Sequence, residues 1–250
     1  ILLLIVSTLL FLEPIMKNVV VPLAPGFEEI ETITVVDILR RSGARVSIAG
    51  TVDGVIEGSR GVKLIADVSI DSIKSENFDL MILHGGQPGT DNLKNDPRVS
   101  LLLKEMESKK KLIGAICAAP IILEENGLLR KRKRTSHPSV KEALLGDLYK
   151  EERVVVDNNI ITSRSPGTAM EFAFKLVEIL FGKDTAEQLK HIEERDLLDI
   201  FEGVPQFEVA KADIDSGAQI IDLLAQKTQV FASNGEARRM LQSNAVSINK

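Results

Sequence analysis

Short apolar runs rich in β-branched residues alternate with stretches of helical periodicity from Lys17 onward. This alternation is typical of βαβ units, in which mostly parallel strands form one sheet with helices on both faces. It therefore predicts an α/β domain. The predicted strands span residues 18–23, 44–49, 80–83, 112–116 and 160–162. The predicted helices span about residues 27–41, 97–109, 118–126 and 168–181.

Changes in residue composition and pattern along the chain predict its domain organisation. Two short β-like runs with Gly58 and Gly61 near their junction predict a hairpin at the sheet edge over residues 54–66. The chain becomes rich in charge after Gly182, which predicts a domain boundary near residue 183. We therefore expect an apolar leader at residues 1–16, one domain at 17–182 and a linker with a small α+β tail at 183–250.

Composition narrows the classes of partner. The net charge of −5 gives no electrostatic reason to expect nucleic acid or an anionic membrane as the main partner, so a small molecule or another protein is favoured. The apolar run at residues 1–12 is shorter than the roughly 20 residues that span a bilayer. It also lacks the basic start of a signal peptide, so Met16 is the expected natural start. The single cysteine cannot form an intrachain disulfide, which favours a cytoplasmic location.

That single cysteine, Cys117, follows an apolar strand and precedes Pro120, which suits the first turn of a helix. A strand-to-helix turn exposes a side chain as a nucleophile elbow does. The positive end of the helix dipole would lower the thiol pKa there and favour a reactive thiolate. The alternative is a buried thiol that packs as a small apolar group.

Three other segments carry polar groups suited to catalysis. Glu31 lies one turn into the helix that follows the first strand, where half-burial would raise its carboxyl pKa. Taken alone, it is better explained as a surface acid than as a catalyst. Gly85 and Gly86 follow another strand, where bare backbone can approach a ligand. His137, in a loop, could act as a general base or orient the thiol. One Cys and three scattered His residues supply no zinc-ligand spacing, and we expect neither metal nor cofactor.

Six segments together resemble the DJ-1/ThiJ/PfpI superfamily, in its DJ-1 branch. They begin at Ala24, Ser59, His84, Ala115, Thr135 and Thr162. The resemblance implies a flavodoxin-like three-layer sandwich, similar to class I glutamine amidotransferases, that usually forms a homodimer. It assigns Cys117 as the nucleophile, Glu31 as the protonated carboxyl beside it and His137 as the nearby histidine. It also assigns the backbone of Gly85, Gly86 and Ala118 to oxyanion binding.

The resemblance implies two kinds of function for the same thiol. One is a cofactor-independent glyoxalase or deglycase that acts on methylglyoxal-type 2-oxoaldehydes or their adducts. The other is a non-enzymatic oxidative-stress sensor or chaperone. Two positions differ from patterns of the superfamily: His84 stands where a proline generally precedes the paired glycines, and Ala118 follows Cys117 where the PfpI protease branch has a histidine.

The tail resembles the anticodon-arm-binding C-terminal region of bacterial tyrosyl-tRNA synthetases, in truncated form, over about residues 185–250. RNA contact would run through Arg238, Arg239 and Lys250. Residues 183–250 carry eight Lys and Arg against twelve Asp and Glu, and this net charge of −4 opposes phosphate binding. A tRNA-binding module is therefore the weakest of the functions considered, and we expect a fusion of two unrelated pieces.

Overall fold

The computed structural model divides into two compact units, residues 1–191 and 192–250. It describes residues 16–144, 146–190, 211–215, 217–228 and 230–242. The predicted leader therefore lies outside the described residues except for Met16. The first unit contains every strand among the described residues.

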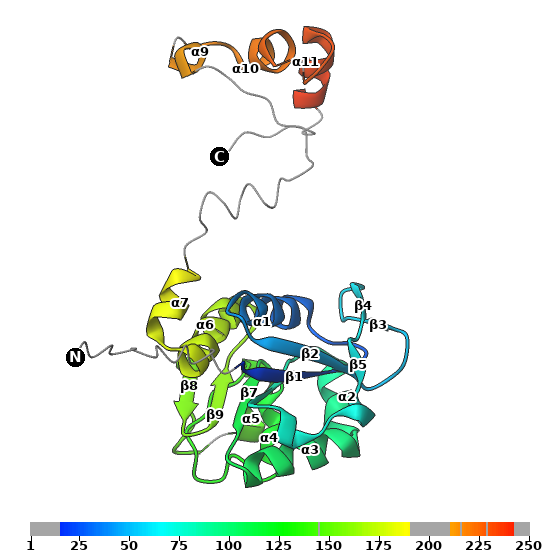
Figure 1. Ribbon diagram of the computed structural model, residues 1–250, viewed down its shortest axis with the longest axis vertical. Coiled ribbons are helices and arrows are strands. Elements are labelled where there is room, and N and C mark those ends of the chain that lie inside the picture. Colours follow the sequence, from blue (N-terminus) through cyan, green and yellow to red (C-terminus); the bar gives the residue numbers. More distant parts are fainter. Residues whose placement is uncertain (1–15, 145, 191–210, 216, 229, 243–250) are drawn as a thin grey trace, which may run out of the picture. The chain divides into compact units, whose positions relative to one another are not determined.

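A seven-stranded sheet forms the centre of the first unit (Figure 1). Its strand order is β5-β2-β1-β6-β7-β9-β8, and all neighbours are parallel except β8 and β9. The strands are β1 (Asn18–Leu23), β2 (Arg45–Gly50), β5 (Val68–Ser69), β6 (Leu80–Leu83), β7 (Leu112–Ile116), β8 (Val154–Asp157) and β9 (Ile160–Ser163).

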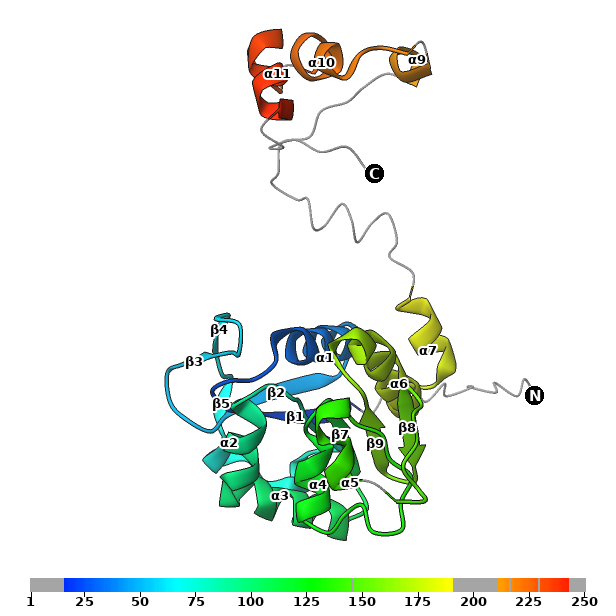
Figure 2. The ribbon, with the colours of Figure 1, turned by 180° about the vertical axis from the view of Figure 1, so that it is seen from behind.

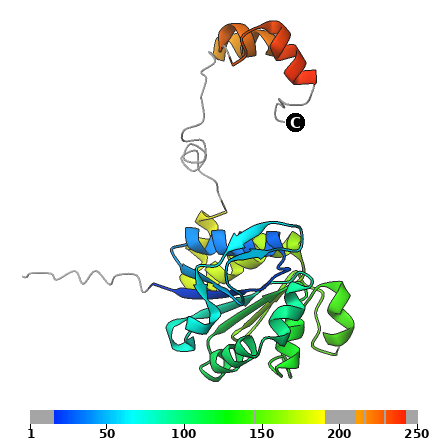
Figure 3. The same ribbon diagram turned by 90° about the vertical axis from the view of Figure 1, so that its right-hand side faces the viewer.

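Helices cover both faces of this sheet, so the first unit is the flavodoxin-like three-layer sandwich that the sequence predicts (Figure 3). One face carries α1 (Glu29–Arg41), α6 (Ala169–Phe181) and α7 (Lys183–Gln188). The other face, seen from behind in Figure 2, carries α2 (Gly89–Asn95), α3 (Pro97–Ser108), α4 (Pro120–Glu125) and α5 (Lys141–Leu144). Short 3-10 turns are η1 (Ile70–Ser72), η2 (Ser75–Asn77), η3 (Pro138–Val140) and η4 (Pro166–Thr168).

Successive side chains of each central strand pack alternately into two separate apolar cores, one on each face of the sheet. Val19 and Val21 pack with α1 and α6, whereas Val20, between them, packs with α3 and α4. This follows from the two-residue period of a strand, which sends successive side chains to opposite faces. The near-continuous apolar character of β1 and β6 is the consequence of burial on both sides.

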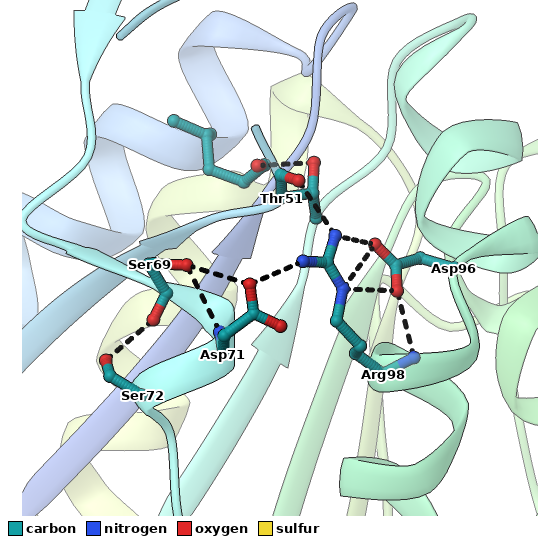
Figure 4. A network of polar contacts seen from close by, with 7 residues as sticks. Thr51, Ser69, Asp71, Ser72, Asp96 and Arg98 are labelled. Atoms are coloured by element: carbon teal, nitrogen blue, oxygen red, sulfur yellow. Dashed lines mark hydrogen bonds and ion pairs between the residues drawn. The ribbon is translucent and has the colours of Figure 1, made fainter. Parts of the chain in front are cut away.

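A polar network joins the segments that follow β2 and β5 to the start of α3 (Figure 4). Arg98 donates to the carbonyl of Thr51, which follows β2, and pairs with Asp71 of η1. Arg98 also pairs at 2.6 Å with Asp96, the residue that caps the start of α3. The guanidinium lowers the pKa of Asp96, so this carboxylate stays charged and keeps these segments together.

Most predicted elements are confirmed to within a residue or two at each end. Residues 54–66 form the predicted hairpin, from β3 (Val55–Glu57) and β4 (Lys63–Ile65). It is, however, a separate two-stranded sheet and does not extend the edge of the main one. The predicted boundary near residue 183 falls at the start of α7, which packs against α6.

The described residues of the second unit form only helices. These are α9 (Lys211–Asp215), α10 (Ile220–Asp222), the π-helical turn η5 (Leu223–Lys227) and α11 (Asn234–Gln242). Arg238 and Arg239 lie exposed on α11, whereas Lys250 lies outside the described residues. Within the part of the chain that the structure describes, no helix has both the length and the apolar character needed to cross a membrane.

Candidate active site

The candidate site lies where the connections of the sheet change direction. The chain runs from β1 to β2 on one side, and β6 lies on the other side of β1. In open α/β sheets such a switch point leaves a crevice at the carboxyl ends of the strands, where ligands bind. The segments that follow β1, β6 and β7 contribute Glu31, Gly85 and Cys117 to this place.

Cys117 occupies a sharp turn directly after β7. Its φ of +65° lies in the left-handed region, which costs a non-glycine residue roughly 1–2 kcal/mol. Backbone hydrogen bonds hold the turn on both sides: the Cys117 N–H donates to the carbonyl of Ser163, and the Cys117 carbonyl accepts from the His137 N–H at 2.7 Å. The side chain is 9% exposed, so the nucleophile elbow leaves the thiol only slightly accessible.

Glu31 is fully buried in the first turn of α1. Its Oε2 accepts a 2.7 Å hydrogen bond from the Gly85 N–H, and its side chain also interacts with the Cys117 thiol. Its other oxygen, Oε1, is buried without a hydrogen-bond partner among the described residues. The side chain of Glu28 caps the helix by accepting from the Glu31 N–H at 2.7 Å. The carboxyl is therefore positioned by α1 and directed toward the thiol.

Gly85 lies between these two side chains. A Cβ at this position would be 2.7 Å from Cys117 Cβ, 2.9 Å from Cys117 Sγ and 2.9 Å from Glu31 Oε2. A side chain here would push the carboxyl and thiol apart. Gly86 has a φ of +95° and packs so closely on the turn before α1 that a Cβ would lie 2.5 Å from the Glu28 nitrogen.

The other residues that the sequence suggests for the site, Ala118, His137 and Gly85, make different contacts with the thiol and with Glu31. The Ala118 N–H hydrogen-bonds to the Cys117 sulfur. His137 is near Cys117 through its backbone, whereas its ring contacts Ser139, with Nδ1 2.8 Å from the Ser139 hydroxyl. Gly85 already donates its N–H to Glu31 and thus holds this carboxyl in place.

Burial controls the protonation of the pair. It raises the pKa of Glu31 from 4.5 to about 7, with a smaller contribution from the charge of Glu28. Burial and the neighbouring Glu31 carboxylate also raise the pKa of Cys117, and the Ala118 N–H opposes this only in part. The sequence predicted that the helix end lowers the pKa of the Cys117 thiol. When Glu31 is ionised, this prediction is wrong. The main reason is burial of the thiol, to which the like charge of Glu31 adds, whereas α4 is only six residues long.

The two groups are best described as one titrating unit that shares a proton. When Glu31 is ionised, its charge opposes formation of the thiolate. When Glu31 is protonated, that repulsion disappears and the carboxyl can donate a hydrogen bond to the sulfur. The arrangement can therefore hold a nucleophilic thiolate beside a proton donor, with one negative charge between them.

Sequence reasoning did not identify two residues that shape this site. Glu28, which the sequence analysis does not single out, is the N-cap that anchors Glu31. His84, noted only as a difference from the superfamily pattern, is 1% exposed at the end of β6. Across the described residues, no group of three or more His, Cys, Asp or Glu side chains is placed to hold a metal ion.

Comparison with known proteins identifies the family of the first unit. The model of the DJ-1/PfpI family matches residues 17–179, about two thirds of the chain. The chain belongs to the DJ-1/PfpI family. The matched range includes Glu31, Gly85 and Cys117, and it ends before the tail, whose resemblance to tyrosyl-tRNA synthetases stays a prediction.

DJ-1 proteins are similar to this chain in sequence and in structure. DJ-1 homolog A of Arabidopsis thaliana is 44% identical over 174 residues, which are 69% of this chain but only 44% of that protein. The dj-1beta protein of Drosophila melanogaster is 42% identical over 176 residues, 69% of this chain and 94% of that protein. The oxidized Toxoplasma gondii DJ-1 structure is 36% identical with a TM-score of 0.68, and the match covers 73% of this chain and 98% of that one.

Proposed function

We propose that the DJ-1/PfpI domain is a cysteine-dependent glyoxalase that needs no glutathione and converts methylglyoxal-type 2-oxoaldehydes to 2-hydroxy acids. The observation that carries this proposal is the contact between Cys117 and the buried Glu31 carboxyl, whose pKa is about 7. A Caenorhabditis elegans relative, named a glutathione-independent glyoxalase, is 38% identical over 176 residues, 69% of this chain and 94% of that protein.

The proposed reaction begins at the sulfur of Cys117. The thiolate attacks the aldehyde carbon, a C–S bond forms, and the carbonyl oxygen takes a proton to give a hemithioacetal. Removal of the hydrogen on that carbon gives an enediol, and return of a proton to the neighbouring carbon gives a thioester of lactate. Water then cleaves the C–S bond, releases lactate and restores the thiol. The net change is addition of one water, with no external oxidant or reductant.

Glu31 is the proposed carrier of the proton between the two carbons. A carboxyl with a pKa of about 7 exchanges protons readily at neutral pH, which suits general acid–base catalysis. His137 is the second candidate, because its backbone lies beside Cys117. The N–H groups of Gly86 and Ala118 are the proposed donors to the aldehyde oxygen, and Gly85 contributes by fixing Glu31.

The same chemistry extends to adducts of 2-oxoaldehydes with amines or thiols. Such adducts regenerate the free aldehyde, and the thiolate could attack that aldehyde within the site. We therefore include deglycase activity in the proposed substrate class. Because the proposed reaction begins at the aldehyde carbon, we expect the free 2-oxoaldehyde to be the better substrate.

The test is lactate formation from methylglyoxal by the intact, reduced chain without glutathione. We expect the chain and a His137→Gln variant both to produce lactate, the variant more slowly by about tenfold or less if Glu31 carries the proton. A His137 variant as inactive as one lacking Cys117 would move the proton transfer to His137. The absence of lactate with the intact, reduced chain would refute the glyoxalase proposal.

Oxidation sensing is the second candidate function. A peroxide would transfer one oxygen to the Cys117 thiolate and leave as water, giving a sulfenic acid. The buried Glu31 Oε1, which has no hydrogen-bond partner among the described residues, could accept from that new hydroxyl. A solved structure similar to this chain is named as an oxidized DJ-1. If no lactate forms, this function is favoured.

We also propose a homodimer formed through α1 and α6. Exposed apolar side chains lie on both helices, Ile30 and Ile33 on α1 and Met170 on α6. An Ile33→Arg variant is expected to sediment as a monomer where the intact chain sediments as a dimer. Leu101→Arg, which changes an exposed apolar residue of α3, is the matched control and should not alter the dimer. A monomeric intact chain would contradict the proposal.

A further inference from the structure

His84 lies between two backbone carbonyls in the interior of the first unit. Its Nε2 is 2.9 Å from the carbonyl oxygen of Pro22 in β1, and its Nδ1 is 3.1 Å from that of Gly85. The Phe27 ring packs edge-on against the imidazole, with centroids 6.0 Å apart and planes at 77°. The Pro22 carbonyl and the Phe27 ring thus hold the imidazole in place, and its other nitrogen faces the Gly85 carbonyl.

The ring connects two strands where their direct pairing has stopped. β1 and β6 pair only through Val19 with Leu80 and Val20 with Met81. Two residues further along β1, the Pro22 carbonyl contacts the ring of His84 instead. The side chain therefore takes the place of a strand–strand contact at the carboxyl ends of β1 and β6, which is the edge where the candidate site lies.

The peptide group after His84 carries the N–H that holds Glu31. This N–H, of Gly85, donates to Glu31 Oε2 at 2.7 Å. The Gly85 carbonyl accepts from the Glu28 N–H at 3.0 Å. Any rotation of the peptide between His84 and Gly85 would therefore change the position of the donor relative to the carboxyl and the adjacent Cys117.

We propose that His84 is a positioning residue of the Cys117–Glu31 site, which anchors β6 to the Pro22 carbonyl and so fixes the Gly85 N–H on the Glu31 carboxyl. The inference rests on the proposed site but not on turnover. His84 contacts neither the thiol nor the carboxyl through any hydrogen bond between described residues, and it acts through the backbone of Gly85.

One ring proton is sufficient for this role. Burial lowers the pKa of His84 although both carbonyl contacts raise it, so the ring is neutral at neutral pH and carries a single N–H. We assign that proton to Nε2, the nitrogen with the shorter contact, from which it donates to the Pro22 carbonyl. The Gly85 carbonyl accepts its hydrogen bond from the Glu28 N–H and not from the ring. The titratable groups on the other side of Gly85 are Glu31, Glu28 and Cys117, and they are the groups that a change at His84 would affect.

The test is an NMR titration of the Gly85 amide in the full chain, because this N–H reports directly on protonation of Glu31. In the intact chain we expect its resonance to titrate with a midpoint near the Glu31 pKa of about 7. In His84→Leu, which has no ring nitrogen, the bond that favours the carboxylate weakens. The midpoint should then move to higher pH by about half a unit or more.

Two variants and one measurement on the intact chain complete the test. His84→Gln keeps a side-chain N–H near the Nε2 position and should give a midpoint closer to that of the intact chain than His84→Leu does. Leu80→Val, at the other end of β6, controls for general loss of stability and should leave the midpoint unchanged. If His84→Leu does not fold, the ring nitrogens of the intact chain decide the matter: a slowly exchanging Nε2 proton supports the proposal, and a proton on Nδ1 alone overturns it.

An unchanged Gly85 midpoint in folded His84→Leu, with only a lower melting temperature, would also overturn the proposal. Since no substrate is needed, this result is separate from failure of the glyoxalase proposal. A chain that forms no lactate could still show the shift, and a chain that forms lactate could lack it.

Discussion

Cys117→Ala is expected to reduce lactate formation from methylglyoxal by about a thousandfold or more, to near the uncatalysed rate. The reason is that the proposed reaction passes through a C–S bond that alanine cannot form. The fold should remain, because alanine keeps the Cβ and only the sulfur is removed from a site that is already closely packed. The rate of lactate formation and the melting temperature, measured on the same preparation, check both parts.

Cys117→Ser is the matched variant for this prediction, since it keeps a polar group of similar size. A serine hydroxyl is far less acidic than a thiol and should be nearly as inactive as alanine here. Lactate formation by Cys117→Ala within tenfold of the intact chain would show that the nucleophile is another group, or that the reaction needs none.

Glu31→Gln is expected to stabilise the protein while it removes activity. The folded pKa of Glu31, about 7, is above its value of 4.5 in the unfolded chain. The folded state therefore binds more protons between these values, so the intact chain loses stability as pH rises from about 4.5 to about 7. Glutamine resembles the protonated carboxyl at every pH, and above pH 7 it should raise the free energy of unfolding by about 3 kcal/mol.

Turnover should fall by about 100- to 10,000-fold in the same variant, because glutamine can donate a hydrogen bond but cannot transfer a proton. Urea unfolding at several pH values and the lactate assay measure the two effects. Asp37→Asn, which changes an exposed carboxyl of α1 away from the site, is the control and should keep both its turnover and the pH dependence of its stability. A Glu31→Gln variant that is less stable than the intact chain above pH 7 would contradict the burial argument.

The sequence predicted the sheet well because burial on both faces leaves a strong local pattern. The predicted strands at residues 80–83 and 112–116 agree with β6 and β7 residue for residue. β8 was missed because Val154–Asp157 lies on the edge and has a buried residue only at Val155. α7 was missed because Gly182, where the predicted domain ends, has a φ of +96° and is followed directly by a new helix.

The sequence predicted which residues form the site, but it did not predict their pKa values. Glu31, Gly85 and Cys117 each follow a strand of one sheet edge, which the order of elements implies. The hydrogen bond from Gly85 to Glu31 links residues 54 positions apart, so no local pattern encodes it. The thiol pKa was misjudged for the same reason: position at a turn is visible in the sequence, whereas the burial of the thiol and the charge that packs beside it are not.

The central claim, that Glu31 controls the ionisation of Cys117, is tested most directly by the rate at which iodoacetamide alkylates the thiol. The intact chain and Glu31→Gln would be compared at pH values on both sides of 7, the Glu31 pKa. Since the variant lacks the charge that opposes the thiolate, its thiol should react about tenfold faster one pH unit above the Glu31 pKa and at about the same rate one unit below it. Alkylation of Glu31→Gln that is no faster than that of the intact chain at every pH would contradict the account.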